Sequence, residues 1–216
     1  MMDLPPLSKE QLSTVLTTSQ TAAELLDILA EYENEACLLS PDSSNSELLS
    51  FFYSSFFIST LLADKILEAR ILTKRMPQTL LQNDPSLQNC LNLLRAVWQH
   101  RHDQVYKILR ELPWSESLKP LVDKYDVHFQ EKTLTEISRA YEAIRPATAA
   151  SYLGLDPASA EKGDPATIQR FTACGWKWNE ETQLLEPKRT VTPSVPDGRL
   201  FNELGEVMAL INNYGS

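Results

Sequence analysis

The chain has 216 residues, of which 43% are hydrophobic, and it carries a formal net charge of −9 at pH 7. That share of apolar residues can form a sizeable core, which argues against global disorder. The acidity argues against nucleic acid and membranes as partners, because binding to phosphates or anionic lipid needs clustered Lys and Arg.

The first two-thirds of the chain are predicted to be helical. No glycine lies between Met1 and Leu153, whereas the tight turns of sheet proteins favour glycine. We expect residues 1–45 to form an N-terminal helical extension. Its apolar stripe consists of Ala22, Leu25, Leu29 and Tyr32. Residues 46–145 are expected to form a helical-repeat stack, similar to tetratricopeptide repeats, because helices joined by short turns pack as antiparallel pairs.

Residues 48–63 are uncharged and mostly apolar. The run is shorter than the roughly 20 residues that span a bilayer, so it predicts a core helix covered on several sides. The chain begins without a basic region followed by an apolar run, so we expect no signal peptide. A second helix, with apolar residues from Leu61 to Leu72, should stop at Met76-Pro77, because the residue before proline avoids helical torsions.

Four further apolar stripes complete the predicted stack. Asp84-Pro85 is a good start for a helix, and Ser115 is a plausible N-cap for a later one. The stripes comprise Leu87, Leu91, Leu94 and Trp98; Val105, Ile108, Leu109 and Leu112, closed by Pro113; Leu118, Leu121, Val122, Tyr125 and Phe129; and Leu134, Ile137, Tyr141 and Ile144, before Pro146.

Residues 146–189 are predicted to form a small winged-helix module. Short helical segments around 147–153, 156–157 and 165–174 come first, and Gly175 occupies the C′ position that ends the third. Alternating aromatic and polar residues on both sides of the polar segment 179–182 then indicate a β-hairpin. Three helices followed by a hairpin is the order of a winged helix.

Residues 190–198 are expected to be a linker, and residues 199–216 a C-terminal helix. The helix could pack back on its own domain or insert into a bundle of partner helices, because an apolar stripe must be covered. We predict protein-interaction residues in the hairpin and in this helix. They are Trp176, Trp178, Leu184, Leu185, Leu200, Phe201, Leu204, Val207, Met208 and Ile211.

Catalytic and ligand-binding patterns are missing from the sequence. In zinc isopeptidases of the JAMM type, His-x-His is followed by Ser and Asp where this chain has Arg110 and Pro113, so His100-Arg101-His102 is interpreted as a solvated turn. The three cysteines are widely spaced, and no nucleophile elbow or phosphate-binding loop occurs. We therefore expect no enzyme activity, metal, cofactor or small-molecule ligand. A nucleic-acid-binding winged helix is a disfavoured alternative, because residues 146–187 hold three cations and six anions.

Several segments resemble the PCI module of the subunit-8 family of the COP-9 signalosome, over roughly residues 50–189. The matching segments are Ala69-Arg70, residues 74–77, Val97-Trp98-Gln99 with Tyr106, Trp114-Ser115, residues 140–144, Leu153-Gly154-Leu155, Gly175-Trp176 and residues 186–189. One departure is a longer stretch between Gly154-Leu155 and Gly175-Trp176. The related proteasome lid subunit and translation initiation factor 3 subunit k are the alternatives.

The resemblance implies a non-catalytic scaffold subunit of the cytoplasm and nucleus. Its partners would be other PCI-domain and signalosome subunits. Winged helices would line up side by side, and C-terminal helices would gather in a bundle. The complex implied by the resemblance removes a ubiquitin-like modifier from cullins (deneddylation), with catalysis in another subunit.

Overall fold

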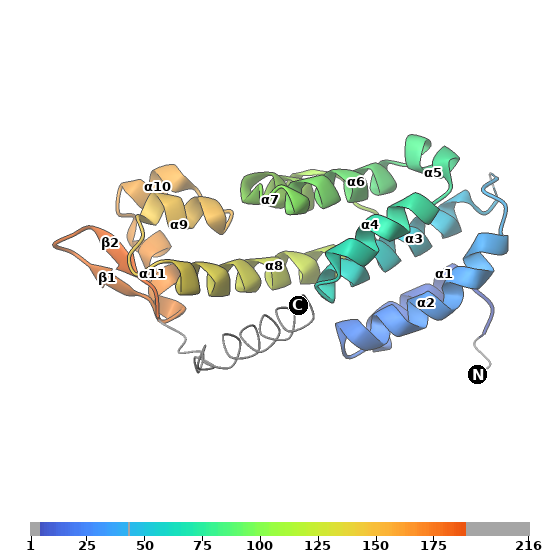
Figure 1. Ribbon diagram of the computed structural model, residues 1–216, viewed down its shortest axis with the longest axis horizontal. Coiled ribbons are helices and arrows are strands. Elements are labelled where there is room, and N and C mark those ends of the chain that lie inside the picture. Colours follow the sequence, from blue (N-terminus) through green and yellow to red (C-terminus); the bar gives the residue numbers. More distant parts are fainter. Residues whose placement is uncertain (1–4, 43, 189–216) are drawn as a thin grey trace, which may run out of the picture.

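The computed structural model describes residues 5–42 and 44–188 and is mainly helical (Figure 1). The helical stack consists of α1 (Lys9–Thr18), α2 (Ala22–Leu38), α3 (Ser46–Leu62), α4 (Ile66–Arg75), α5 (Gln78–Asn83), α6 (Pro85–Trp98), α7 (His102–Glu111) and α8 (Lys119–Ala140). The end module consists of α9 (Pro146–Tyr152), α10 (Pro157–Glu161), α11 (Pro165–Ala173), β1 (Lys177–Asn179) and β2 (Leu184–Glu186). The predicted fold class is confirmed. The predicted linker 190–198 and the C-terminal helix lie outside the described residues.

Helix α3 is the centre of the stack and is buried on all sides from Leu49 to Leu62, as the uncharged segment predicts. Its hydroxyl groups are compatible with burial because some bond to the helix backbone. Ser59 donates to the carbonyl of Ser55 at 2.7 Å, and Thr60 donates to that of Phe57 at 2.6 Å. Among the described residues, none of the helices has the combination of length and apolar character needed to traverse a bilayer.

The predicted start of the helix after α3 is wrong. The chain leaves α3 at Leu62 and turns through Asp64, whose φ is +59°, before α4 begins at Ile66. The backbone N–H of Lys65 donates to the carbonyl of Thr60 at 2.9 Å and closes the turn. The predicted end is confirmed, since Met76 is extended immediately before Pro77.

Helix α6 starts as predicted but faces the core differently. Asp84 accepts the N–H of Leu87 at 2.9 Å, and Pro85 occupies the first turn. Within the predicted stripe, Leu87 is fully buried, Leu91 and Leu94 are half-buried, and Trp98 is 46% exposed. The fully buried apolar residues of this helix are Leu87, Cys90, Leu93 and Ala96.

Helix α8 replaces two predicted elements. It begins at Lys119 rather than after Ser115, whose carbonyl instead accepts the N–H groups of Leu118 and Lys119 in the preceding turn. It then runs for 22 residues to Ala140, so two predicted stripes belong to one helix. Ile144 is not helical, because it pairs with Leu185 in an isolated β-bridge.

The described residues form two hydrophobic cores, and α8 contributes to both. The first core runs from Leu7 to Phe129 and includes the N-terminal helices, so the extension is docked on the stack. The second contains Ile137 of α8 together with residues up to Leu185. The packing of the end module therefore begins within α8, before residue 146.

Candidate interaction surface

Two helices of the winged module, α10 and α11, begin at an aspartate that caps the first turn. Asp156 caps α10 by accepting the N–H groups of Ala158 and Ser159, and Asp164 caps α11 by accepting that of Thr167 at 3.0 Å. Bonds from Ser159 and from these backbone groups lower the pKa of the Asp156 carboxyl. The longer stretch seen in the sequence thus forms α10 and a turn at Gly163, whose φ is +71°.

The predicted hairpin is confirmed, and it lies beside a third extended segment. Trp178 pairs with Leu185 between the antiparallel strands β1 and β2. On the other side of β2, the N–H of Ile144 donates to the carbonyl of Leu185 at 2.8 Å, and the reverse bond is 2.9 Å. Within residues 44–188, β1 is therefore the open edge of this small sheet. An open edge exposes backbone groups that can pair with another chain.

The four predicted interaction residues of the hairpin divide into two pairs. Trp176 and Leu185 are buried, so their side chains belong to the module's own core rather than to an exposed surface. The indole N–H of Trp176 donates to Oγ of Ser138 on α8 at 3.1 Å. Trp178 and Leu184 are half-buried and remain available at the surface. The six predicted residues on the C-terminal helix lie outside the described part of the chain.

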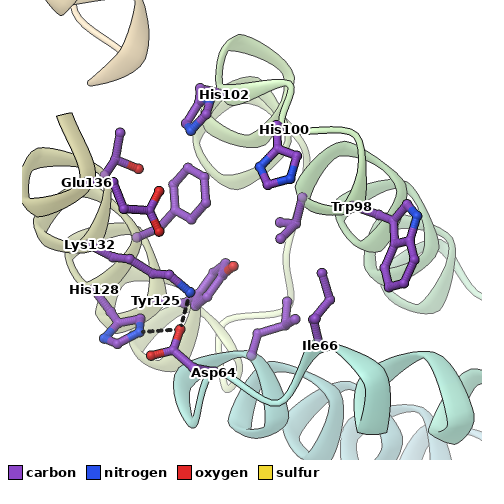
Figure 2. Close-up of a pocket in the computed structure, with 13 residues that line it drawn as sticks. Asp64, Ile66, Trp98, His100, His102, Tyr125, His128, Lys132 and Glu136 are labelled. Carbon is purple, nitrogen blue, oxygen red and sulfur yellow. Dashed lines mark hydrogen bonds and ion pairs between the residues drawn. The ribbon is translucent and has the colours of Figure 1, made fainter. Parts of the chain in front are cut away.

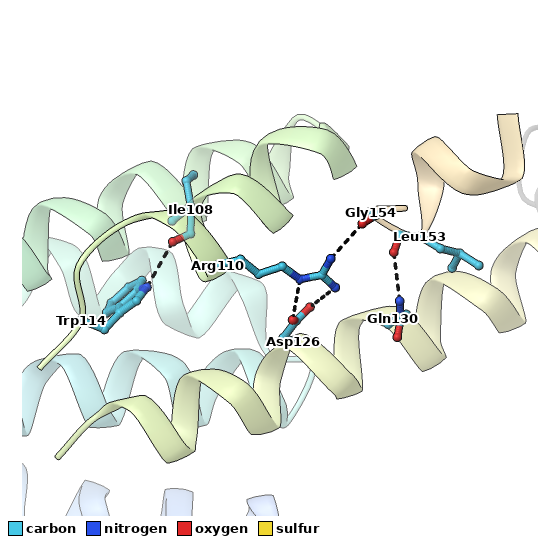
Figure 3. A network of polar contacts seen from close by, with 7 residues as sticks. All are labelled: Ile108, Arg110, Trp114, Asp126, Gln130, Leu153 and Gly154. Atoms are coloured by element: carbon cyan, nitrogen blue, oxygen red, sulfur yellow. Dashed lines mark hydrogen bonds and ion pairs between the residues drawn. The ribbon is translucent and has the colours of Figure 1, made fainter. Parts of the chain in front are cut away.

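A polar network fixes the module against the stack (Figure 3). Arg110 of α7 donates two bonds to Asp126 of α8, at 2.8 and 3.0 Å, and a third to the carbonyl of Gly154 at 2.8 Å. Gln130 of α8 donates to the carbonyl of Leu153 at 2.9 Å. The hydrogen bonds to Asp126 raise the pKa of Arg110, so the charged pair is stabilised where the two parts meet.

The loop after α9 also packs tightly on α7. The guanidinium of Arg110 lies over the ring of Tyr106 at 4.5 Å. Gly154 lies on the same ring with a φ of +64°. This network was not predicted, because it joins residues that are distant in the chain. The glycine itself was a usable signal, since it is the first after a run of 153 residues without one.

A cavity of about 290 Å³ gathers all three histidines of the chain (Figure 2). His128 and Lys132 of α8 bond to Asp64 at 3.4 and 2.6 Å. Burial alone would raise the pKa of Asp64, but the bonds and charges of these two neighbours outweigh it and lower that pKa. Three of the polar groups that line the cavity, Asp64, His128 and Lys132, thus already pair with one another.

The histidine turn is only partly the solvated turn expected from the sequence. His100 and Arg101 are exposed, but His102 is half-buried beside the rings of Phe129 and Tyr152, with centroids 5.5 and 5.2 Å away. Burial lowers the pKa of His102 and favours its neutral form. Over the described ranges, no group of three His, Cys, Asp or Glu side chains could hold a metal ion.

The fold and this surface define a class: a helical-repeat protein that carries a winged-helix module on a shared helix. The comparisons with known proteins agree with that class. Residues 47–195 match the model of the CSN8/PSMD8/EIF3K family, and the chain belongs to this family.

Individual relatives share a single description, COP9 signalosome complex subunit 8. The protein of Emericella nidulans is 56% identical over 216 residues, which is 100% of both chains. That of Dictyostelium discoideum is 25% identical over 172 residues, or 80% of each chain. That of Danio rerio is 23% identical over 164 residues, which cover 74% of this chain and 82% of the relative.

Proposed function

We propose that this chain is a non-catalytic scaffold subunit of a COP9 signalosome. The observation that carries the proposal is full-length similarity, at 56% identity, to a protein described as subunit 8 of that complex. The alternatives were a proteasome lid subunit and a subunit of translation initiation factor 3. The family model covers both of them, but none of the relatives reported above is described as either.

The winged module is the proposed contact with neighbouring subunits. Its open strand β1 can add a strand from a partner, since main-chain pairing at a sheet edge is a common recognition mode. Half-buried Trp178 and Leu184 would supply apolar contacts beside that edge. Buried Trp176 and Leu185 would hold the strands in place from within. Residues 199–216, which the sequence predicts to form an apolar helix, would join a bundle of partner helices.

In this proposal, the catalytic activity of the complex belongs to another subunit. The resemblance supports a role in removing the ubiquitin-like modifier from cullins, in the cytoplasm and nucleus. Nucleic acid is not a proposed partner, because the exposed hairpin tip carries Glu180 and Glu181 and no cation.

The test is purification of the tagged full-length chain from its own cells, followed by identification of the bound proteins by mass spectrometry. Other signalosome subunits should co-purify in constant proportion. Recovery of proteasome lid or initiation factor subunits instead would contradict the proposal. Immunofluorescence of the same tagged chain tests the location.

A further inference from the structure

Helices α4 and α6 border a second surface, which we call the α4–α6 groove. It is an open depression of about 400 Å³ on the helical stack. It is lined by Arg70, Thr73, Lys74, Leu91, Leu94, Arg95, Trp98 and Gln99. Trp98, labelled in Figure 2, lines both this groove and the histidine cavity.

The groove is apolar at its base although it is open to solvent. Leu91, Leu94 and Trp98 are the part of the predicted α6 stripe that the core leaves only partly covered. Elsewhere on α4, Leu67 and Ile71 are 61% and 52% exposed, but they do not line the groove. Single exposed apolar residues are ordinary, but apolar side chains gathered in one open groove are typical of a binding surface.

The polar rim of the groove is cationic. Arg70, Lys74 and Arg95 line it, and no acidic residue does. The guanidinium of Arg70 lies 5.2 Å from the centre of the Trp98 ring. None of the three cations forms an ion pair with an acidic side chain in the described ranges. In a chain of net charge −9, this local excess of positive charge needs an explanation.

We propose that the α4–α6 groove binds an acidic amphipathic helical segment of a partner protein. Carboxylates of the segment would pair with the cationic rim, and its apolar side chains would cover Leu91, Leu94 and Trp98. A small anion would leave that apolar base uncovered. A membrane or nucleic acid needs a broader basic surface than three cations provide.

The dimensions of the groove agree with a short helix. Leu91 and Trp98 are seven residues apart on α6, which corresponds to about 10 Å, or two helical turns. A segment with apolar residues at positions i, i+3, i+4 and i+7 presents them over the same length. This surface lies on the stack and not on the winged module, so it does not depend on the proposed strand edge.

The first experiment uses the full-length chain and a labelled model peptide, and it reads binding from fluorescence anisotropy. The peptide carries leucine at i, i+3, i+4 and i+7 and glutamate at the remaining positions. Binding should weaken as salt is raised, and a peptide with glutamine in place of glutamate should bind about tenfold more weakly. Arg95→Glu and Trp98→Ala should each weaken binding by at least about tenfold.

Lys124→Glu is the matched control, because it makes the same charge change at an exposed position of α8 outside the groove. It should leave binding unchanged, and circular dichroism checks that each variant is folded. No binding of the acidic peptide overturns the proposal. Equal loss in Lys124→Glu and Arg95→Glu also overturns it, as does full displacement of the peptide by millimolar inorganic phosphate.

The second experiment identifies the occupant. A photoactivatable amino acid replaces Gln99, and the tagged chain is cross-linked within its purified assembly. A cross-link to an acidic, apolar segment of another polypeptide supports the proposal. A cross-link to residues 189–216 of the same chain, a cross-link to a second copy, or no cross-link overturns it. Peptide binding needs no assembly, so its failure is distinguishable from failure of the scaffold proposal.

Discussion

Gly154 packs so closely on Tyr106 that a Cβ atom at Gly154 would lie 2.4 Å from Cγ of the ring. The glycine also has a φ of +64°, a region that costs other L-residues about 1–2 kcal/mol. The position therefore demands glycine for two independent reasons.

Replacing this glycine should loosen the module from the stack. Gly154→Ala is expected to lower the free energy of unfolding by about 2–5 kcal/mol, from backbone strain and overpacking together. Urea denaturation measures the change. Gly163→Ala is the matched control, because its φ is +71° but nothing lies within 4 Å of the new Cβ. It should cost only about 1–2 kcal/mol, and equal costs would rule out the steric argument.

The Arg110–Asp126 pair should contribute measurable coupling. Its side chains are 39% and 22% exposed, so screening limits the interaction to about 1 kcal/mol. A double-mutant cycle with Arg110→Ala and Asp126→Ala, read by urea denaturation, gives the value. The Lys9–Glu47 pair is more exposed, at 44% and 83%, and serves as the comparison. A coupling energy at Lys9–Glu47 as large as that at Arg110–Asp126, or larger, would contradict this expectation.

Ser138 should support the winged module through Trp176. Its hydroxyl accepts the indole N–H and donates to the carbonyl of Leu134 at 2.8 Å. Ser138→Ala leaves a buried indole N–H without a partner, so we expect a loss of about 1–3 kcal/mol in thermal or urea unfolding. Ser151→Ala, which removes an exposed hydroxyl bonded to its own helix, should change stability by less than about 0.5 kcal/mol. Similar losses in both variants would contradict this role.

His102 should make the free energy of unfolding depend on pH in the mildly acidic range. Its pKa in the folded chain lies below the ordinary value of 6.5, because burial disfavours the charged ring. The unfolded chain then binds the proton more readily, so stability is full above about pH 6.5 and is lost as pH falls through the lower folded value. Urea midpoints from about pH 7.5 to 5 measure this slope. His102→Gln should flatten it, and an unchanged slope would exclude His102 as its source.

The segment 199–216, predicted from the sequence to be helical, should be needed for assembly but not for folding. Both cores of the described residues lie within residues 7–185, so deletion of residues 199–216 is expected to leave a folded chain that no longer enters the complex. Leu204→Asp with Ile211→Asp should have the same effect, whereas Glu203→Ala with Glu206→Ala should not. Co-purification and circular dichroism provide the two readouts. Full incorporation of the truncated chain would disprove the anchoring role.

Much of the fold follows from local rules that the sequence displays. The uncharged run before Ala63 predicts burial because charges are too costly in a core, and it forms the central helix. Asp84-Pro85 begins a helix because the carboxylate accepts an N–H group that no helical carbonyl can reach. The hairpin follows from alternation around a polar tip.

The predictions from the sequence fail where packing against neighbouring elements determines the local structure. Two overlapping stripes run along α6, and packing against its neighbouring helices, α7 and α3 foremost, buries Cys90 and Leu93 more fully than Leu94 and Trp98. The break at Asp64 has no glycine or proline to announce it. In the hairpin, alternation separates two faces but does not show which face packs on Ile137 and Phe171. Trp176 was therefore predicted to lie at an exposed interaction surface, whereas it is buried in the core of the module.

Helix α8 has a mechanical consequence. It is a continuous rod of 22 residues, about 33 Å long, whose two ends are embedded in different cores. The hairpin end of the molecule and the helical stack are therefore connected through one continuous helix. Lys132 and His128 lie near the middle of this rod, so the histidine cavity that they line is built on the helix that the two cores share.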